Sequence, residues 1–299
     1  MTSPVRAFAQ LSAGRRGILW VVLTTLMFVG TDTIAKYLSQ TYPVPQIVWA
    51  RYAFHALVMA AVFGRRLPAM MRTRRPGLQL TRSVLVLIAT VVAFMAFRVM
   101  PLADVTAIWA TTPIMVTALS VPLLGERVGP RRWAGVAAGF VGALVIIRPG
   151  LGVMHPAAFL ALASAVAMAL FHLATRSLAR TDSALTSLAY TAALGLVASC
   201  AWAPFFWVAP DAWGWTLMAA LGLLAGMGHF TLIKGLEAAP ASTVIPFLYT
   251  NLLWATISGL VFFGDLPDVA TVTGAVIIVS SGLYIFHRER AKRDEGRAP

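Results

Sequence analysis

Charged and titratable side chains inside long apolar segments are the residues of this chain that could do chemistry. Asp32 and Lys36 stand four residues apart in one segment, and Arg51 and His55 do so in the next. Residues at this spacing share one face of a helix. If those helices cross a bilayer, each charge costs at least about 2.5 kcal/mol and needs compensation. We favour a structural ion pair between Asp32 and Arg51, and recognition of a substrate charge or proton coupling is the alternative.

Three histidines, His55, His172 and His229, lie in three different apolar segments. They are too far apart in sequence for a local zinc motif, so no metal site and no cofactor are expected. Each could carry a coupling proton near physiological pH, or could donate a hydrogen bond to a neighbouring helix. We group His55 and His229 with Asp32 and Arg51 as a candidate set for coupling or charge recognition.

Aromatic, hydroxyl and amide side chains gather in the middle of two other segments. A small amphipathic solute needs apolar walls and a few oriented polar contacts, and these side chains supply both. Ordinary helix packing is the alternative for each of them. The predicted substrate-binding residues are Trp109, Thr111, Thr112, Tyr249, Asn251 and Trp254, with Thr250 beside them.

The elements that must position these side chains are membrane-spanning helices. Of the 299 residues, 59% are hydrophobic and 12% are charged. About 20 apolar residues cross the hydrocarbon core of a bilayer. The sequence predicts an all-α integral membrane protein with ten helices at 17–38, 44–64, 80–100, 104–124, 132–148, 156–175, 185–208, 214–236, 242–263 and 269–287.

The chain contains an internal repeat, because residues 101–146 align without a gap on residues 240–285, an offset of 139. Five helices in each copy is an odd number, so the second copy enters the membrane from the other side. We expect inverted repeats at 14–150 and 151–288 around a central cavity, followed by a cytoplasmic tail at 289–299. The landmarks in register are Pro101 with Pro240, Gly125-Glu126 with Gly264-Asp265, and Gly135 with Gly274.

The net charge of +13 is distributed by loop parity. With the N-terminus inside, 20 of the 24 Lys and Arg residues fall in the termini and in alternate loops, including Arg65 to Arg82. This bias predicts a multi-pass protein of the bacterial inner membrane with both termini cytoplasmic, and it argues against nucleic-acid binding. The first helix is expected to be retained because no small-residue cleavage pattern follows it.

Several smaller features refine this interpretation. Cys200 is the single cysteine and is interpreted as a packing residue. No Walker-type glycine loop is present, so ATP-driven transport would need a separate subunit, and we expect that no ATPase subunit is required. Glycines at 135, 139 and 142 predict close helix packing. Static bends or hinges are predicted at Pro113, Pro122, Pro204 and Pro246.

The chain resembles the drug/metabolite transporter superfamily of the EamA repeat type over nearly its whole length. The resemblance rests on Trp49-Ala50-Arg51-Tyr52 after Pro43-Val44-Pro45, on Gly125-Glu126-Arg127, and on the glycine-spaced helix that follows. The second copy keeps weaker versions, with Gly264-Asp265 in place of Gly-Glu. The stretches around Asp32-Lys36 and Gln46-Arg51 are also similar to a bacterial subgroup of metabolite or S-adenosylmethionine transporters.

This resemblance implies a ten-helix basket around a central cavity, and a single chain that moves small metabolites. We expect amino acids, including aromatic ones, as the substrate, with S-adenosylmethionine or another nucleoside-like metabolite as the alternative. An intramembrane enzyme fits poorly because a matched nucleophile and base are missing. A channel fits poorly because the helices are too apolar. Proton-coupled and facilitative transport both stay open, as do the direction of transport and the oligomeric state.

Overall fold

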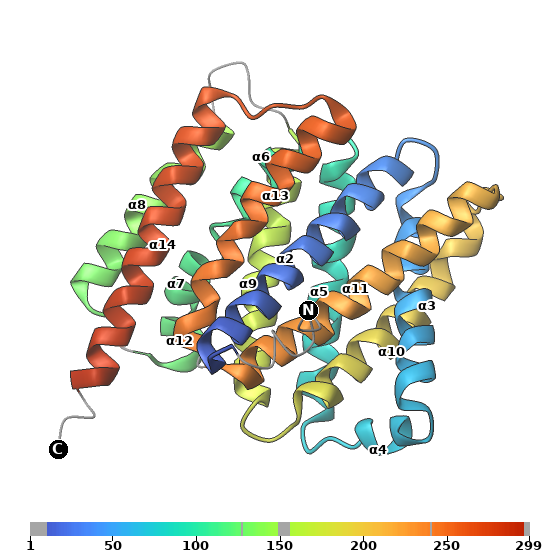
Figure 1. The fold of residues 1–299 in the computed structure, drawn as a ribbon, viewed down its shortest axis with the longest axis horizontal. Coiled ribbons are helices and arrows are strands. Elements are labelled where there is room, and N and C mark those ends of the chain that lie inside the picture. Colours follow the sequence, from blue (N-terminus) through green and yellow to red (C-terminus); the bar gives the residue numbers. More distant parts are fainter. Residues whose placement is uncertain (1–10, 127, 149–155, 240, 296–299) are drawn as a thin grey trace, which may run out of the picture.

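Ten helical spans, each long and apolar enough to cross a membrane, make up the computed structural model of this chain (Figure 1). The structure describes residues 11–126, 128–148, 156–239 and 241–295, and within them the regular structure is entirely helical. The first five spans are α2 (Ala13–Leu38), α3 (Val44–Phe63) with η1 (Gly64–Arg66) and α4 (Leu67–Met70), α5 (Pro76–Phe97), α6 (Leu102–Trp109) with α7 (Thr112–Leu124), and α8 (Pro130–Ile147).

The second five spans follow in the same order. They are α9 (Ala158–Leu178), α10 (Ala184–Trp202) with η2 (Ala203–Phe206), α11 (Ala212–Ala238), the composite ninth span, and α14 (Val269–Glu295). The ninth span consists of α12 (Ala241–Val244), η3 (Ile245–Tyr249), α13 (Thr250–Ser258) and η4 (Gly259–Phe263). The ten predicted helices are therefore confirmed, with boundaries that differ by a few residues.

Helix ends are set by side-chain caps and by left-handed glycines. Ser183 Oγ accepts a hydrogen bond from the Thr186 amide at 3.0 Å, and Asp211 Oδ1 accepts one from the Gly214 amide at 2.6 Å, so α10 and α11 begin there. Gly125 (φ 67°) and Gly264 (φ 70°) end α7 and η4 in a conformation that favours glycine. These two glycines correspond at the offset of 139, so both halves stop the same helix in the same way.

The packing of the helices is consistent with the predicted inverted repeat. α2 packs along α11, and α5 packs along α9. In the predicted repeat α2 corresponds to α9, and α5 corresponds to α11. The two pairs are therefore equivalent when the first five spans are exchanged for the last five. The pairs α3 with α10, α6 with α13, and α8 with α14 map onto themselves in the same exchange. In Figure 1, α8 and α14 form one edge of the bundle, and α3, α10 and α11 form the other.

The glycine stripe of α8 packs against α14, as predicted. A Cβ added to Gly142 would lie 2.9 Å from the carbonyl oxygen of Gly274, and one added to Gly274 would lie 2.5 Å from that of Gly142. The hydroxyl of Ser281 donates to the carbonyl oxygen of Gly135 across the same interface. Only glycine permits this approach of the two backbones.

Prolines mark most of the interruptions within spans. Pro113 lies in the first turn of α7, just after the break that follows Trp109, and Pro246 lies in the 3-10 segment η3. Pro204 lies in the 3-10 segment η2, whereas Pro122 is accommodated inside α7. Cys200, interpreted from sequence as a packing residue, is instead exposed on α10.

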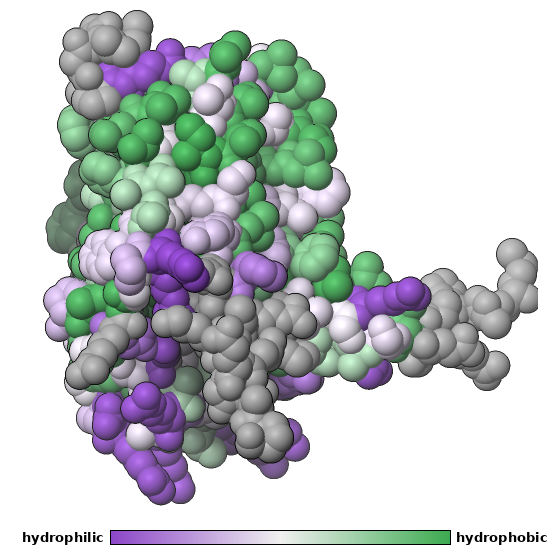
Figure 2. Space-filling view, turned by 90° about the vertical axis from the view of Figure 1, so that its left-hand side faces the viewer, coloured by the Kyte–Doolittle hydropathy of each residue, from purple (hydrophilic) through white to green (hydrophobic). Residues whose placement is uncertain are grey.

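The surface divides into zones along the direction of the spans. Figure 2 shows hydrophilic side chains gathered at the lower end, with hydrophobic side chains predominating above them. α2 begins and α14 ends at the lower side of Figure 1. We call this the N-terminal side and the other the opposite side. α14 runs through Glu295, beyond the predicted repeat boundary, and Arg127, Pro240, residues 149–155 and residues 296–299 of the predicted motifs and domains lie outside the described residues.

Candidate functional site

The two interrupted spans correspond in the repeat and lie side by side. α6 ends at Trp109 and α7 begins at Thr112, while the ninth span turns from 3-10 helix to α-helix at Thr250. Thr250 aligns with Thr111 at the offset of 139, so the interruptions fall at nearly the same repeat position. Because α6 packs against α13, the two groups of predicted cavity residues lie on neighbouring helices.

Trp109, Thr111 and Thr112 on the fourth span are held by contacts inside the bundle. Trp109 Nε1 donates to Ser164 Oγ on α9 at 3.1 Å, and its ring packs edge-on against a phenylalanine of α5. Thr111 Oγ1 donates to the Ile108 carbonyl oxygen at 2.6 Å, and Thr112 is buried beside it. These contacts fix the orientation of Trp109.

Tyr249, Asn251 and Trp254 on the ninth span carry polar atoms without partners. Within the described part of the chain, Tyr249 Oη, Asn251 Oδ1 and Trp254 Nε1 are enclosed and make no hydrogen bond. The Tyr249 hydroxyl packs against Gly282 of α14, where a Cβ would lie 1.8 Å from it. Most buried polar atoms in proteins are paired, so three unpaired atoms on two turns of one span indicate where water or a ligand completes the hydrogen bonds.

Asp32 and Arg51 do not form the ion pair that the sequence favoured. Among the described residues no ion pair within 4 Å includes either side chain. Arg51 Nη1 instead lies 3.4 Å from Thr90 Oγ1, and its guanidinium lies 5.1 Å from the ring centre of Tyr52. Asp32 is buried in α2. Their role in coupling or charge recognition stays a prediction.

His55 and His229 stack on one another between α3 and α11. Their ring centres are 5.8 Å apart with an angle of 13° between the planes, and Phe28 meets His229 edge-on. Both ring nitrogens of His55 and Nε2 of His229 are enclosed without a hydrogen-bond partner in the described part of the chain. The structure therefore brings together two of the four predicted coupling residues.

Sequence reasoning missed two ion pairs, each of which joins the ends of spans from opposite halves. Lys36 Nζ on α2 donates to Asp265 Oδ2, after η4, at 2.7 Å and to the Met100 carbonyl oxygen at 2.9 Å. Arg176 Nη2 on α9 lies 2.5 Å from Glu126 Oε1, after α7. The acids at 126 and 265 are separated by the repeat offset, and this register was the available signal.

These two ion pairs lie on opposite sides of the membrane. α2 and α9 are the first spans of the two halves, and five crossings separate their ends. The Lys36 pair is therefore on the opposite side and the Arg176 pair is on the N-terminal side. Lys36 is nearly enclosed, with 9% of its side chain exposed, whereas 54% of the Arg176 side chain is exposed.

Arg82 is a further correction to the sequence analysis, which counted it among the charges of a cytoplasmic loop. α5 begins at Pro76, so Arg82 lies more than one turn inside the span, and it is buried. It donates from Nε to Thr175 Oγ1 at 2.7 Å and from Nη1 to the Ser187 carbonyl oxygen at 2.9 Å. The uncertain start of the helix hid this residue from sequence reasoning.

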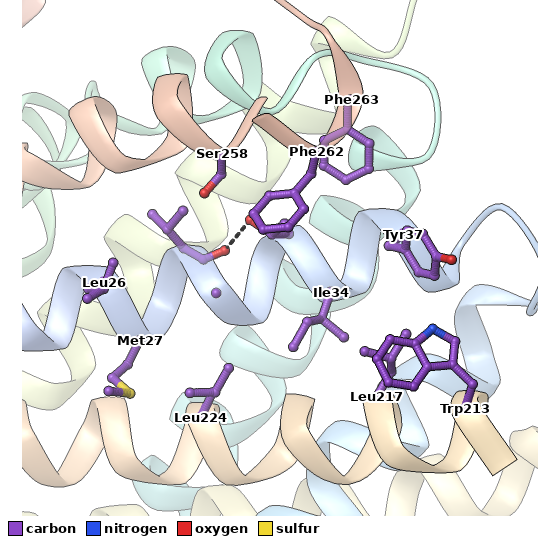
Figure 3. Close-up of a pocket in the computed structure, with 13 residues that line it drawn as sticks. Leu26, Met27, Ile34, Tyr37, Trp213, Leu217, Leu224, Ser258, Phe262 and Phe263 are labelled. Carbon is purple, nitrogen blue, oxygen red and sulfur yellow. Dashed lines mark hydrogen bonds between the residues drawn. The ribbon is translucent and has the colours of Figure 1, made fainter. Parts of the chain in front are cut away.

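A groove of about 480 Å³ runs beside α2, between α11 and the end of the ninth span. Figure 3 shows Ser258 and Phe262 above α2, and Leu217 and Leu224 on α11 below it. Its walls are aliphatic and aromatic, with few polar groups. None of the predicted substrate-binding residues lines this groove.

A polar cluster lies at the opposite side, where α6, α8 and α14 meet. Thr271 Oγ1 donates to Asp104 Oδ1 at 2.9 Å, and Arg148 pairs with Asp268. The hydrogen bond from Arg148 lowers the pKa of the Asp268 carboxyl below its ordinary value. Asp104, Arg148, Asp268 and Thr271 line a second cavity of about 330 Å³. Among the described residues no group of three His, Cys, Asp or Glu side chains could hold a metal ion.

Ten spans, interrupted helices that correspond in the repeat and buried polar groups at membrane depth define a multi-pass membrane transporter. The chain belongs to the EamA-like transporter family, whose model matches residues 15–148 and again residues 155–286.

Three relatives are all described as transporters. The chain is 24% identical to the S-adenosylmethionine uptake transporter of Rickettsia prowazekii, over 92% of this chain and 93% of the relative. It is 30% identical to the riboflavin transporter of Rhizobium johnstonii, over 91% of each chain. It is 27% identical to the pseudopaline exporter of Pseudomonas aeruginosa, over 89% of this chain and 94% of the relative.

A solved crystal structure has the same fold. Its TM-score to this chain is 0.61 at 20% sequence identity, and the match covers 90% of this chain and 95% of that one.

Proposed function

We propose that this protein carries a small organic metabolite across the bacterial inner membrane by alternating access. The main support is that two ion pairs, Lys36–Asp265 and Arg176–Glu126, occupy corresponding positions in the two halves. They join corresponding helices on opposite sides of the membrane. In the proposed cycle one pair holds its side closed while the other opens. The two halves rock about a pseudo-two-fold axis, as inverted repeats permit.

The substrate that we propose is a metabolite with a carboxylate and an aromatic or heterocyclic part, with S-adenosylmethionine as the first candidate. The sequence analysis favoured amino acids, but the relatives named above move S-adenosylmethionine, riboflavin or pseudopaline. S-adenosylmethionine contains an amino-acid end, so the two expectations share a chemical group. Free amino acids are the second candidate, supported only by the resemblance.

The proposed binding region lies between the interrupted fourth and ninth spans. The unpaired polar atoms of Tyr249, Asn251 and Trp254 support it, because a substrate bound there would supply their missing partners. Trp109, Thr111 and Thr112 would form the facing wall. If Trp109→Ala and Asn251→Ala both leave rates and selectivity unchanged in correctly inserted protein, this assignment is wrong.

The experiment that tests the function is uptake into liposomes that contain the purified protein. Labelled S-adenosylmethionine, riboflavin and a panel of amino acids are offered separately, with protein-free liposomes as the control. We expect saturable uptake of S-adenosylmethionine. Saturable uptake of amino acids alone would replace the proposed substrate, and no saturable uptake of any compound would refute the proposed substrate class.

The orientation is also a proposal, with both termini in the cytoplasm. The cluster of arginines between the second and third spans supports it, since positive charge favours the cytoplasmic side. Reporter fusions after Gly77 and after Ala179 should report a cytoplasmic location, and a fusion after Thr41 a periplasmic one. The reverse pattern would overturn the orientation.

A further inference from the structure

Arg82 is a buried cation whose charge has no acidic partner. Only 7% of the residue is exposed. All the hydrogen bonds of its guanidinium go to neutral oxygens, including the one from Nη1 to Thr191 Oγ1 at 2.8 Å. The guanidinium carbon also lies 4.3 Å from the ring centre of Phe171 on α9. Three helices of both halves therefore hold the group in one orientation.

The acid that is linked to this network is already engaged. Asp182 accepts from Thr73 Oγ1 at 2.5 Å and from Gln79 Nε2 at 2.8 Å, and none of the ion pairs within 4 Å among the described residues includes Arg82. A fixed positive charge at membrane depth is costly unless a partner compensates it. None of the ion pairs within 4 Å among the described residues compensates the charge of Arg82, so a purely structural role leaves the cost of that charge unexplained.

One nitrogen of this guanidinium is still free to bind. Nε and Nη1 are occupied, while Nη2 makes no hydrogen bond within the described part of the chain. Nη2 is also not among the fully enclosed unpaired atoms. It therefore has accessible surface and two N–H groups for an acceptor from outside the chain.

The surroundings of Arg82 favour an anion. A second cation reaches the helix that carries Arg82, because Arg51 Nη1 on α3 lies 3.4 Å from Thr90 Oγ1 of α5. His55, 1% exposed, adds two unpaired ring nitrogens to this region. Among the described residues Asp32 is the one acid classed as buried, and it lies on α2. A site of this kind attracts and orients negative groups.

We infer that Arg82 binds the carboxylate of the transported metabolite through Nη2. This inference rests on the proposed function and specifies which part of the substrate is recognised and by which residue. Arg82 lies eight residues before Thr90 on α5, about 12 Å along the axis, so the carboxylate is held nearer the N-terminal side than Arg51. Thr175, Thr191 and Phe171 are positioning residues, because they hold the guanidinium so that Nη2 faces the substrate.

The test compares S-adenosylmethionine with its decarboxylated analogue, which lacks only the carboxylate. Binding to the purified wild-type protein is measured by thermal stabilisation in detergent, and transport is measured in liposomes. We expect the carboxylate form to bind about tenfold to a hundredfold more tightly, as the loss of one charged hydrogen bond implies. Equal affinity for the two compounds in the wild type would overturn the inference without any variant.

The variant arm uses Arg82→Gln, with Arg82→Lys to retain the charge. In Arg82→Gln the preference for the carboxylate form should disappear, whereas uptake of the decarboxylated analogue should persist. Arg82→Lys should keep part of the preference. Arg98→Gln, an exposed arginine at the end of the same helix, is the matched control and should behave as the wild type.

Two failures are distinguishable. If the wild type moves neither compound, the proposed substrate is wrong. If the wild type prefers S-adenosylmethionine and Arg82→Gln keeps that preference undiminished, the transport function stands and the role of Arg82 is refuted.

Discussion

Lys36 Nζ lies 2.7 Å from Asp265 Oδ2, and this ion pair ties the end of the first span to the turn that ends the ninth. Gly264 creates that turn in a left-handed conformation, so Asp265 is presented towards α2. Glu126, after Gly125, occupies the same repeat position and binds Arg176 of the sixth span. In each half, the acid after the glycine turn that ends the fourth span therefore pairs with a cation near the end of the first span of the other half.

Breaking the Lys36 pair should weaken closure of the opposite side. Asp265→Asn leaves a nearly enclosed ammonium unpaired, so we expect transport to fall about tenfold, or about 1.4 kcal/mol. The reversed pair, Lys36→Asp with Asp265→Lys, should recover part of the rate in liposome uptake. Asp268→Asn, which breaks the more exposed pair with Arg148 on the same side, is the control and should change the rate little.

Asp265→Asn should also make the opposite side of the protein more accessible to reagents in water. Cys200→Ser removes the single cysteine, and Met100→Cys then places a buried thiol beside Lys36. A maleimide that cannot cross membranes should label Met100→Cys several times faster from the opposite side when Asp265 is Asn. Unchanged labelling would show that the pair has no part in closing that side.

Glu126→Gln should have a smaller effect than Asp265→Asn. More than half of the Arg176 side chain is exposed, and exposed ion pairs contribute about 0–1 kcal/mol. We expect a loss of transport of less than about fivefold in the same uptake assay. If Glu126→Gln loses more transport than Asp265→Asn, the idea that the more buried ion pair contributes more would be contradicted.

Asp32→Asn should separate exchange from proton coupling. The buried carboxyl of Asp32 has no ion-pair partner within 4 Å among the described residues, so it can accept a proton during the cycle. We expect substrate exchange to persist and stimulation by an imposed pH gradient to be lost. A variant that responds to the gradient as the wild type does would exclude Asp32 as the coupling group, and a wild type without any response would favour a facilitator.

Gly274→Ala should destabilise the contact between α8 and α14. Its Cβ would lie 2.5 Å from the Gly142 carbonyl oxygen, and a backbone atom cannot move aside easily. Overpacking of this kind costs about 1–3 kcal/mol, so the thermal midpoint in detergent should fall. Gly77→Ala is the matched control, because a Cβ there meets nothing within 4 Å, and its midpoint should stay at or above that of the wild type.

The spans were predictable because their length and hydropathy depend only on local sequence. The correspondence of Gly125-Glu126 with Gly264-Asp265 was also visible, since the repeat keeps the turn in register. The partners of those acids were not predictable. Lys36 is 229 residues from Asp265 in the chain, and only the packing of α2 against the ninth span brings them together.

The candidate site was predictable only in part. Residue type and depth selected Tyr249, Asn251 and Trp254, which carry polar atoms without a hydrogen-bond partner among the described residues, and their role in binding stays a prediction. The pairing of Asp32 with Arg51 failed as a prediction because equal depth does not fix which faces of two helices meet. Arg82 was missed because the predicted helix start at residue 80 left it at the helix end, whereas α5 begins at Pro76 and places Arg82 more than one turn inside.

Counterflow of S-adenosylmethionine tests the central claim most directly. Liposomes that contain the protein are loaded with unlabelled S-adenosylmethionine and diluted into a trace of the labelled compound. A carrier that alternates between two sides should accumulate labelled substrate transiently above its external concentration. Each export of an unlabelled molecule returns the binding site to the outside, where it can bind and import a labelled molecule. We predict this overshoot in the wild type and a slower, smaller overshoot in Asp265→Asn. Label that only rises to equilibrium, at a rate independent of the internal substrate, would contradict alternating access.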